Sequence, residues 1–243
     1  MRIESWVQFP GWPTMFLSIV IPVRDEAGTL PVTLARLQAL RRAGHEVLVV
    51  DGGSRDGTPA VVEGLADALL HSRPGRARQM NAGAAQARGE VLLFLHADTR
   101  LPEEAVTAIA AALAGGASWG RFDVRLSGDD WRLRIIERLM NLRSCLTGMA
   151  TGDQALFVRR DVFERIGGFP DQPLMEDLEL SRRLKRRGRP ACLRPPVITS
   201  SRRWESRGVL RTVLLMWSLR LAWFLGVSPR RLVRFYYPGW REE

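Results

Sequence analysis

The chain has 243 residues, 46% of them hydrophobic, and a formal net charge of +10 that comes almost wholly from arginine. This length fits one large domain with at most an appendage, and we expect no second independent domain. The charge suits phosphate-rich ligands, anionic membranes and nucleic acid equally, so it selects none of them. The two cysteines, Cys145 and Cys192, form no Cys-x-x-Cys pair, which argues against structural zinc and favours a reducing, cytoplasmic compartment.

The first half of the chain alternates strand-like and helix-like segments, which is typical of a mostly parallel sheet covered by helices. Short apolar runs predict strands at residues 16–23, 46–50, 68–71 and 91–95. Helices are predicted at residues 31–42, from Thr58-Pro59, through residues 81–88 and after Pro102. The first apolar run is short and follows prolines rather than a basic region, which is not typical of a secretory signal.

Two carboxylates follow strands of this predicted sheet. Asp51 ends one strand and Asp98 lies just past another. Both should therefore lie at the carboxyl edge of the sheet, where open α/β folds bind ligands. Neither a Gly-x-Gly-x-x-Gly nor a Gly-x-x-x-x-Gly-Lys-Ser/Thr motif occurs, which weakens the dinucleotide-binding and P-loop interpretations.

Five ordered blocks of sequence resemble the family 2 glycosyltransferases: LSIVIPVRDE, VVDGGSRDGT, GRARQMNAG, FLHADT and EDLELSRRL. Together they are far more specific than any single block. The resemblance covers residues 16–204 and implies a GT-A fold, a Rossmann-like α/β arrangement that binds nucleotide diphosphate sugars. Within that family, the motifs HADT, GDQ and LMEDLELSRRL are together similar to a bacterial branch associated with arsenosugar biosynthesis.

The resemblance implies a set of residues that contact the nucleotide sugar: Pro22, Arg24, Glu26, Asp51, Arg76, Arg78, Ala97 and Asp98. Asp51 would accept hydrogen bonds from the base or ribose, a role that suits a carboxylate. Its alternative role is structural, because Asp51-Gly52-Gly53 and Asp56-Gly57 are both typical of turns. We favour binding for Asp51 and a turn for Asp56. Without the resemblance, Arg76 and Arg78 would be interpreted as solvated charges on a helix face.

His96-Ala97-Asp98 takes the place of the family's Asp-x-Asp signature, whose last carboxylate binds a divalent ion that bridges the donor diphosphate. The resemblance therefore makes Asp98 the expected ligand of Mg²⁺ or Mn²⁺, hard ions that prefer oxygen. Such an ion neutralises the charge that builds on the departing nucleoside diphosphate. His96 departs from the signature, and we favour a hydrogen-bonding or strand-end role for it over that of a second ligand.

The acidic pair Glu176-Asp177 matches the pair that opens a helix in the family, where the aspartate is the general base. Asp177 is therefore the expected catalytic residue, with Glu176 on the acceptor side. The alternative is a simple helix start, because acids in a first turn interact favourably with the helix dipole. The resemblance implies further site residues, namely Asp153 and Gln154 for the acceptor and Arg203 and Trp204 for the diphosphate.

The C-terminal part of the chain is basic and aromatic. Its apolar stretch at residues 209–227 contains Arg220, which would cost about 2.5 to 3.5 kcal/mol inside a membrane-spanning helix, so a span is disfavoured. A helix at an anionic membrane surface fits the interleaved aromatic and basic residues. A core helix or a dimer face with an arginine rim fits equally well, and nucleic-acid binding fits least. The residues concerned are Trp217, Trp223, Phe224, Arg230, Arg231, Arg234, Tyr236, Tyr237 and Trp240.

These observations divide the chain into an N-terminal extension at residues 1–15, a GT-A domain at 16–204 and a helical tail at 205–243. We predict an inverting transferase that moves a sugar from a nucleotide diphosphate sugar, UDP-linked, to an acceptor hydroxyl. It would act in the cytoplasm, with peripheral contact at the inner face of the cell membrane. The alternatives are a nucleotidyltransferase-like enzyme and a non-catalytic protein that binds membranes or nucleic acid. The first normally has a glycine-rich basic loop where this chain has Arg24-Asp25-Glu26.

Overall fold

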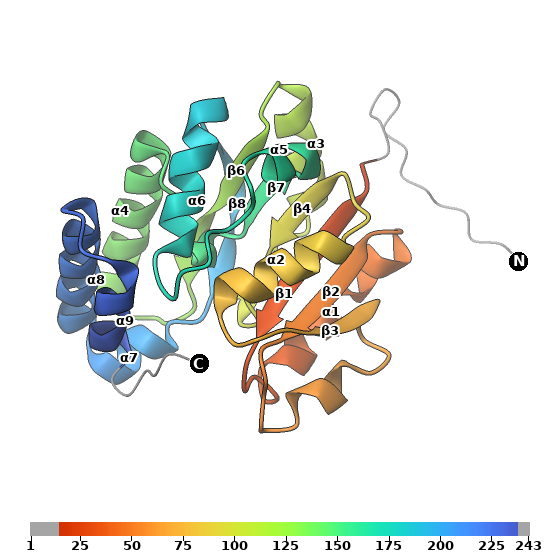
Figure 1. Ribbon diagram of the computed structural model, residues 1–243, viewed down its shortest axis with the longest axis horizontal. Helices are drawn as coiled ribbons and strands as arrows, with labels where there is room; N and C mark the ends of the chain where they lie inside the picture. Colours follow the sequence, from red (N-terminus) through yellow and green to blue (C-terminus); the bar gives the residue numbers. More distant parts are fainter. Residues whose placement is uncertain (1–14, 238–243) are drawn as a thin grey trace, which may run out of the picture.

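The computed structural model describes residues 15–237, apart from the side chain of Arg207. The predicted extension therefore lies outside the described residues except for Met15, as does Trp240. Within this part, eight strands form one sheet in the order β3-β2-β1-β4-β7-β6-β8-β5 (Figure 1). The strands are β1 Leu17–Val23, β2 Glu46–Asp51, β3 Ala68–His71, β4 Val91–Phe94, β5 Thr99–Arg100, β6 Trp119–Leu126, β7 Leu156–Arg159 and β8 Ala191–Thr199.

The directions of the strands determine where a ligand can bind. β1 is parallel to both β2 and β4, and β2 is parallel to β3, so the carboxyl ends of these four strands lie at one edge. β7 is antiparallel to β4 and β6, whereas β6 and β8 are parallel. The predicted α/β class and the parallel first half of the sheet are therefore confirmed.

Helices cover both faces of the sheet. The side chains of a strand alternate between the two faces, so each face carries apolar side chains that a helix buries. In β1, Ile19 and Ile21 join a core cluster with α1 and α3, whereas Val20 packs on the other face beneath α2, α5 and α6. Gly83 of α2 permits a close approach there, since a Cβ on it would lie 2.4 Å from Cγ1 of Val20. The helices are α1 Leu30–Arg42, α2 Arg76–Gln86, α3 Ala105–Ala114, α4 Trp131–Thr147, α5 Arg160–Arg165, α6 Glu176–Leu184, α7 Arg202–Arg207, α8 Val209–Phe224 and α9 Pro229–Tyr236.

The C-terminal helices pack against the domain through a third core cluster. Leu219 of α8 and Val233 of α9 are buried in it together with Leu178 of α6. Figure 1 shows α8 and α9 at the same end of the molecule as α4. Among the described helices, none has the length and apolarity needed to cross a membrane. Because Leu219 is buried, one side of α8 packs in the core, which agrees with the core-helix interpretation of the tail.

Two predicted helices differ from the observed ones. The segment from Thr58 forms only a short 3-10 helix, Thr58–Val62, and its N-cap is Gly57 in a left-handed conformation rather than the threonine hydroxyl. α2 begins at Arg76, five residues before the predicted start at Asn81. Gly75, with φ +134°, is the N-cap of the helix, and the polar first turn of the helix has no apolar periodicity from which the start could be predicted.

The two cysteines are joined in a disulfide between α4 and β8, with their Cα atoms 6.0 Å apart. The sequence interpretation treated Cys145 and Cys192 as separate thiols of a reducing compartment. It missed the pairing because 47 residues separate them in sequence, and only the packing of α4 on β6, next to β8, brings them together.

Candidate active site

Both predicted carboxylates lie at the carboxyl edge of the parallel strands. Asp51 is the last residue of β2 and pairs in register with Val23 of β1. Asp98 follows β4, which ends at Phe94 on the other side of β1. The prediction that two separate strands direct acids to one edge of the sheet is therefore confirmed.

The carboxylate of Asp51 is largely occupied by its own loop. Its Oδ2 accepts a hydrogen bond from the backbone N–H of Gly53 at 3.0 Å, and Ser54 donates from its backbone N–H at 3.2 Å. The side chain is 4% exposed, and Nδ1 of His71 lies 3.7 Å from Oδ2. The turn that was the alternative for Asp51 is thus present. The turn expected at Asp56 is confirmed by the hydrogen bond that Oδ1 accepts from the N–H of Thr58 at 3.0 Å.

The loop after β1 lies against the loop after β2. The backbone N–H of Glu26 donates to Oγ1 of Thr58 at 2.8 Å, which fixes the position of the Glu26 backbone. Pro22 is half-buried in β1, and Arg24 is exposed on the loop. Burial raises the pKa of Glu26. Pro22, Arg24 and Glu26, which are predicted to contact the nucleotide sugar, therefore lie at the edge of the sheet beside the Asp51 turn.

Asp98 and Glu26 share one arginine. Nη2 of Arg202 lies 3.9 Å from Oδ2 of Asp98 and 3.9 Å from Oε2 of Glu26. Within residues 15–237, no group of three or more His, Cys, Asp or Glu side chains is arranged to hold a metal ion. The Asp98 carboxylate alone would supply one oxygen ligand to a Mg²⁺ or Mn²⁺ ion, and such an ion can take its other oxygens from a diphosphate and water.

His96 lies between Asp98 and the loop after α4. Its Nε2 is buried and has no hydrogen-bond partner among the described residues, and a Cβ on Gly152 would lie 2.7 Å from it. Burial, with the charges of Arg76 and Arg203, lowers the pKa of His96 to about 3, so the imidazole is neutral at physiological pH. Ala97 is buried.

Two backbone N–H groups hold Asp177 at the start of α6. Oδ1 accepts from the N–H of Leu178 at 2.8 Å, and Oδ2 accepts from the N–H of Gly152 at 2.9 Å. Met175, with φ +63°, turns the chain into the helix. Asp177 therefore lies at a helix start and also contacts the loop that faces His96, so the two interpretations of the acidic pair are compatible.

Arg76 and Arg78 take different positions on α2. Nη1 of Arg76 lies 3.3 Å from Oε1 of Glu176, whose side chain is 4% exposed. Burial raises the pKa of Glu176, and the charge of Arg76 opposes this effect. Nε of Arg78 instead pairs with Asp171 at 2.8 Å on the surface. Arg76 thus reaches the site, whereas Arg78 is a helix-face charge, as the alternative interpretation predicted.

The two residues predicted for the acceptor pocket also differ. Gln154 is fully buried, and its Nε2 donates to Oγ of Ser144 at 2.9 Å while its Oε1 accepts from the N–H of Thr151 at 3.2 Å. It therefore supports the loop from inside and is not exposed to an acceptor. Asp153 is half-buried, its Oδ1 has no hydrogen-bond partner among the described residues, and burial raises its pKa.

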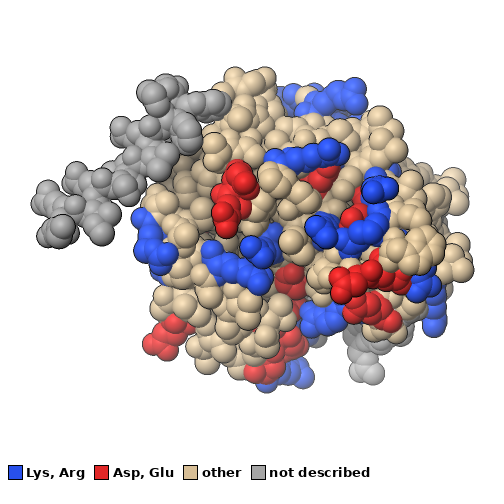
Figure 2. All heavy atoms as spheres, turned by 180° about the vertical axis from the view of Figure 1, so that it is seen from behind, with Lys and Arg blue, Asp and Glu red and all other residues tan. Residues whose placement is uncertain are grey.

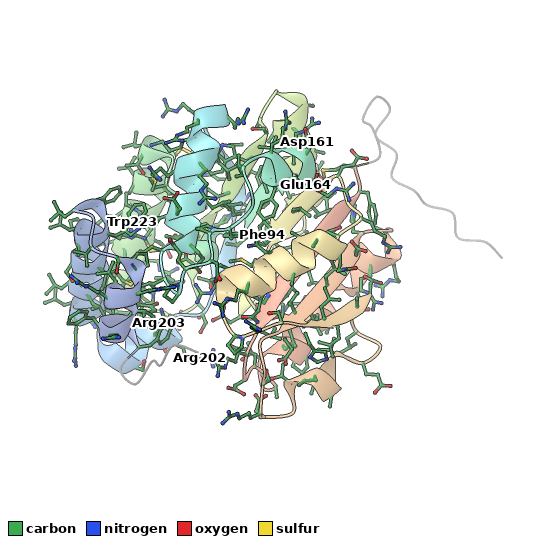
Figure 3. All side chains as sticks on the ribbon, in the orientation of Figure 1. Phe94, Asp161, Glu164, Arg202, Arg203 and Trp223 are labelled. Carbon is green, nitrogen blue, oxygen red and sulfur yellow. A yellow bond between two sulfur atoms is a disulfide. The ribbon has the colours of Figure 1, made fainter. Side chains whose placement is uncertain are left out.

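The predicted diphosphate residues lie on α7, beside the C-terminal helices. Figure 3 shows Arg202 and Arg203 near the carboxyl edge of the sheet, below α8 and α9. The guanidinium of Arg203 stacks over the ring of Tyr236 at 4.7 Å, and Trp204 is half-buried. The tail therefore takes part in positioning a cation of the site.

Two arginines of the site were missed by sequence reasoning, namely Arg143 and Arg220, whereas Arg202 belongs to the segment Arg202-Arg203-Trp204 that the resemblance places near the diphosphate. Arg220 had a visible signal, since it is a single charge inside an apolar stretch, but the sequence interpretation used it only against a membrane span. Arg143 lies on α4 among three other arginines and shows no distinguishing pattern.

A cavity lies away from this site. It is lined in part by Met15, Leu113 and Glu164. Figure 3 shows Glu164 at the opposite end of the molecule from Arg202 and Arg203. The cavity therefore does not belong to the arrangement at the carboxyl edge.

Comparison with known proteins places these observations in a family. The family model described as Glycosyl transferase family 2 matches residues 18–167. The undecaprenyl-phosphate 4-deoxy-4-formamido-L-arabinose transferase of Pseudomonas aeruginosa is 32% identical over 164 residues, which are 61% of this chain and 47% of that protein. That of Aeromonas hydrophila is 31% identical over 136 residues, 51% of this chain and 42% of that protein. The chain thus spans less than half the length of these curated relatives.

Solved structures share the fold. The mannosyltransferase from Pyrobaculum calidifontis in complex with GDP-Man and Mn²⁺ has a TM-score of 0.58 and 22% identity, covering 76% of this chain and 56% of its own. Glucosyl-3-phosphoglycerate synthase from Mycobacterium tuberculosis, in complex with Mn²⁺, UDP and glucosyl-3-phosphoglycerate, has a TM-score of 0.56 and 17% identity, covering 81% and 77%. At these identities the likeness concerns the fold, and it agrees with a GT-A arrangement.

Proposed function

Because the chain belongs to glycosyl transferase family 2, we propose that it transfers a sugar from a nucleotide diphosphate sugar to an acceptor hydroxyl. The observation that supports this most directly is the position of Gly152. Its N–H donates to Asp177 at 2.9 Å, and its Cα faces His96, two residues before Asp98. This contact links the proposed base to the segment that carries the proposed metal ligand, which supports a role for both in one reaction.

In the proposed reaction, the acceptor oxygen attacks the anomeric carbon from the face opposite the diphosphate. The bond from that carbon to the diphosphate oxygen breaks, the nucleoside diphosphate leaves, and the acceptor proton passes to Asp177. The configuration at the anomeric carbon is inverted by this single displacement. When bound at Asp98, a divalent ion would neutralise the charge that develops on the leaving diphosphate.

The remaining site residues have supporting parts in the proposal. Pro22, Arg24, Glu26 and Asp51 would bind the nucleoside at the ends of β1 and β2. Arg203 and Trp204 would face the diphosphate, since α7 lies at the same edge and Arg202 is 3.9 Å from Asp98. The neutral imidazole of His96 adds no positive charge beside the leaving group.

The test of this function is donor binding by the Asp98→Ala variant. Isothermal titration with UDP-sugars and with GDP-sugars, each with and without Mn²⁺, should show tight binding of one donor only when the ion is present. Asp98→Ala should lose this metal dependence, while Asp171→Ala, which removes a surface carboxylate paired with Arg78, should keep it. Unchanged Mn²⁺-dependent affinity in Asp98→Ala would exclude the metal assignment.

The same titration separates the alternatives. A nucleotidyltransferase-like enzyme would bind a nucleoside triphosphate in preference to the nucleotide sugar. A non-catalytic membrane- or nucleic-acid-binding protein would bind neither in a metal-dependent manner.

The acceptor and the biological setting are also proposals. The curated relatives are named for transfer to undecaprenyl phosphate, a lipid acceptor, whereas the motifs around His96, Gly152 and Asp177 are similar to the arsenosugar-associated branch. We propose the arsenosugar-associated branch as the closer assignment, with an enzyme that contacts the membrane peripherally. Activity on water-soluble acceptors in the absence of lipid would agree with this assignment.

Membrane contact is proposed for the tail because residues 209–237 contain arginines but no Asp or Glu. By contrast, Figure 2 shows acidic and basic side chains interspersed over the face seen from behind. The tail should confer salt-sensitive binding to anionic vesicles, and replacing Arg230, Arg231 and Arg234 by Gln should weaken that binding. Equal sedimentation with neutral and anionic vesicles would refute the electrostatic part of this proposal.

A further inference from the structure

Two arginines next to the proposed base have no part in the function described above. Arg143 lies on α4 and Arg220 on α8, and both interact electrostatically with Asp153 and Asp177. Nε and Nη2 of Arg143 are buried without hydrogen-bond partners among the described residues, and so is Oδ1 of Asp153. A hydrogen bond from Nε2 of Gln154 to Oγ of Ser144 at 2.9 Å joins the segments that carry Asp153 and Arg143. Buried polar atoms are nearly always hydrogen-bonded in native proteins, so these two donors and one acceptor are available to a polar ligand.

Charge neutralisation of Asp153 and Asp177 does not by itself explain why Arg143 and Arg220 lie near them. Among residues 15–237, neither the Arg143 nor the Arg220 side chain forms an ion pair within 4.0 Å; Arg143 also lies within electrostatic range of Arg121, which is a further positive charge. Asp177 instead receives its hydrogen bonds from the backbone of Gly152 and Leu178. Burial and the charge of Arg220 lower the pKa of Arg143 to about 10, so the guanidinium of Arg143 remains positive at neutral pH. Arg220 is positive as well, because arginine side chains stay protonated in proteins.

The two arginines lie on the acceptor side of the site. Arg202 is the cation next to Glu26 and Asp98, where the donor is proposed to bind. Arg143 and Arg220 instead act on Asp153 and Asp177, the residues of the acceptor loop and the proposed base. Leu219, next to Arg220, is buried together with Leu178, next to Asp177, so the positive charge of α8 acts at the carboxylate that the acceptor hydroxyl must approach.

We propose that Arg143 and Arg220 bind a phosphate ester group of the acceptor and so hold its hydroxyl against Asp177. The inference rests on the proposed function and names the chemical class of its acceptor. Two guanidinium forks with free donors match the charge and geometry of a phosphate monoester better than they match a neutral sugar. Asp153, whose carboxyl Oδ1 also has no partner among the described residues, can accept a hydrogen bond from a hydroxyl of the same ligand.

A phosphate ester could reach this site from solution or from a lipid headgroup. α4 and α8, whose inner faces carry the two arginines, expose large apolar side chains at helical spacing on their outer faces, each 47% exposed or more. These residues are Trp131, Ile135, Leu139, Leu142 and Leu146 on α4, and Leu210, Leu214, Trp217, Leu221 and Phe224 on α8. Such faces would allow the two helices to lie on a bilayer and take a headgroup from it.

The experiment measures phosphate binding by the full chain, separately from donor binding. Calorimetric titrations use glycerol 3-phosphate and inorganic phosphate as soluble probes, and glycerol as the uncharged comparison. Arg143→Gln and Arg220→Gln are compared with Arg138→Gln and Arg211→Gln, which remove exposed arginines from the same two helices. Because hydrogen bonds to charged groups are strong, each test variant should lose about tenfold or more in affinity for glycerol 3-phosphate. The matched controls should stay within about twofold.

A second measurement identifies the source of the phosphate. Neutral phosphatidylcholine vesicles are compared with vesicles that also contain phosphatidic acid, and the same four variants are sedimented with each. Loss of phosphatidic acid binding in the Arg143 and Arg220 variants alone would assign a lipid acceptor, whereas loss confined to soluble glycerol 3-phosphate would assign a small one.

Equal affinities for glycerol 3-phosphate in wild type, test variants and controls would overturn the inference, as would equal losses in all four variants. If Arg143→Gln does not fold, Arg220→Gln decides, because Arg220 lies on a different helix and tests the same site independently. Titration with nucleotide sugar and Mn²⁺ is run on every variant. Intact donor binding with unaltered phosphate binding would refute only this inference, whereas a wild type that binds no nucleotide sugar would refute the proposed function.

Discussion

The Asp177→Asn variant tests the catalytic role most directly, because the substitution keeps the size of the side chain but removes its basicity. A positioned base contributes about 10²- to 10⁴-fold to the rate, so turnover should fall by that factor. Donor affinity should stay nearly unchanged, since the donor is proposed to bind at Asp98 rather than at Asp177.

The structure also predicts a cost in stability. Asp177 accepts hydrogen bonds from two N–H groups, of Leu178 at 2.8 Å and Gly152 at 2.9 Å, and an asparagine has only one acceptor oxygen for them. Loss of one hydrogen bond to a charged group costs about 1.5 to 3 kcal/mol. For a chain of this size, that corresponds to a fall in melting temperature of roughly 3 to 12 °C.

Three measurements on the variant therefore separate chemistry from structure: melting temperature by calorimetry, donor affinity by titration, and turnover by release of nucleoside diphosphate. Glu179→Gln is the matched control on the same helix, because Glu179 pairs with Arg182 and Arg183 outside the site. It should keep wild-type turnover. A less stable Asp177→Asn protein that retains full turnover would refute the catalytic role and leave Asp177 as a structural residue of the helix start.

Three further predictions concern the fold and the site. Gly83→Ala should destabilise the protein by about 1 to 3 kcal/mol in denaturant unfolding, because its Cβ would lie 2.4 Å from Val20; an unchanged midpoint would contradict the packing of α2 on β1. Gly152→Ala, whose Cβ would lie 2.7 Å from Nε2 of His96, should lower turnover more than stability, and equal activity would show that this loop tolerates displacement. Burial raises the pKa of Glu46, but its hydrogen bonds from Arg88 and Ser18 and the charge of Arg88 lower it below the usual value overall. Its stabilising contribution is thus present above the usual glutamate pKa and lost as the pH falls through the lower folded value, so Glu46→Gln should flatten acid unfolding in that window, and an identical pH profile would contradict it.

The sequence by itself determined the class of the fold and the edge where ligands bind. Apolar runs such as residues 46–50 have only one way to be buried, as strands covered on both sides, so their pattern is local and readable. A residue that ends or closely follows such a strand lies near the carboxyl edge, as Asp51 at the end of β2 and Asp98 after β4 do. The ordered blocks identified the family, which the match at residues 18–167 confirms.

Local chemistry was readable only where a single segment decides the outcome. The turn at Asp56 was predicted because Asp-Gly pairs favour turns wherever they occur. The helix from Thr58 was wrong, because capping depends on the conformation of Gly57, which the loop after β1 constrains through its hydrogen bond to Thr58.

Tertiary structure alone decided which side chains share the site. Arg76 and Arg78 are indistinguishable in sequence, yet one pairs with Glu176 across the site and the other with Asp171 on the surface. Gln154 looked like a pocket residue until packing placed it at zero exposure against Ser144. These outcomes depend on the direction of a side chain relative to elements far away in sequence.

The cluster at Asp177 shows the same limit most clearly. Arg143 and Arg220 lie 77 positions apart by their numbers, and their charges act on the same carboxylate only because α8 packs beside the start of α6. Electrostatic interactions extend over several ångströms and are independent of sequence separation. Periodicity and motifs therefore predict which residues are buried or turned, whereas the charges that meet at one carboxylate are determined by the packing of the whole chain.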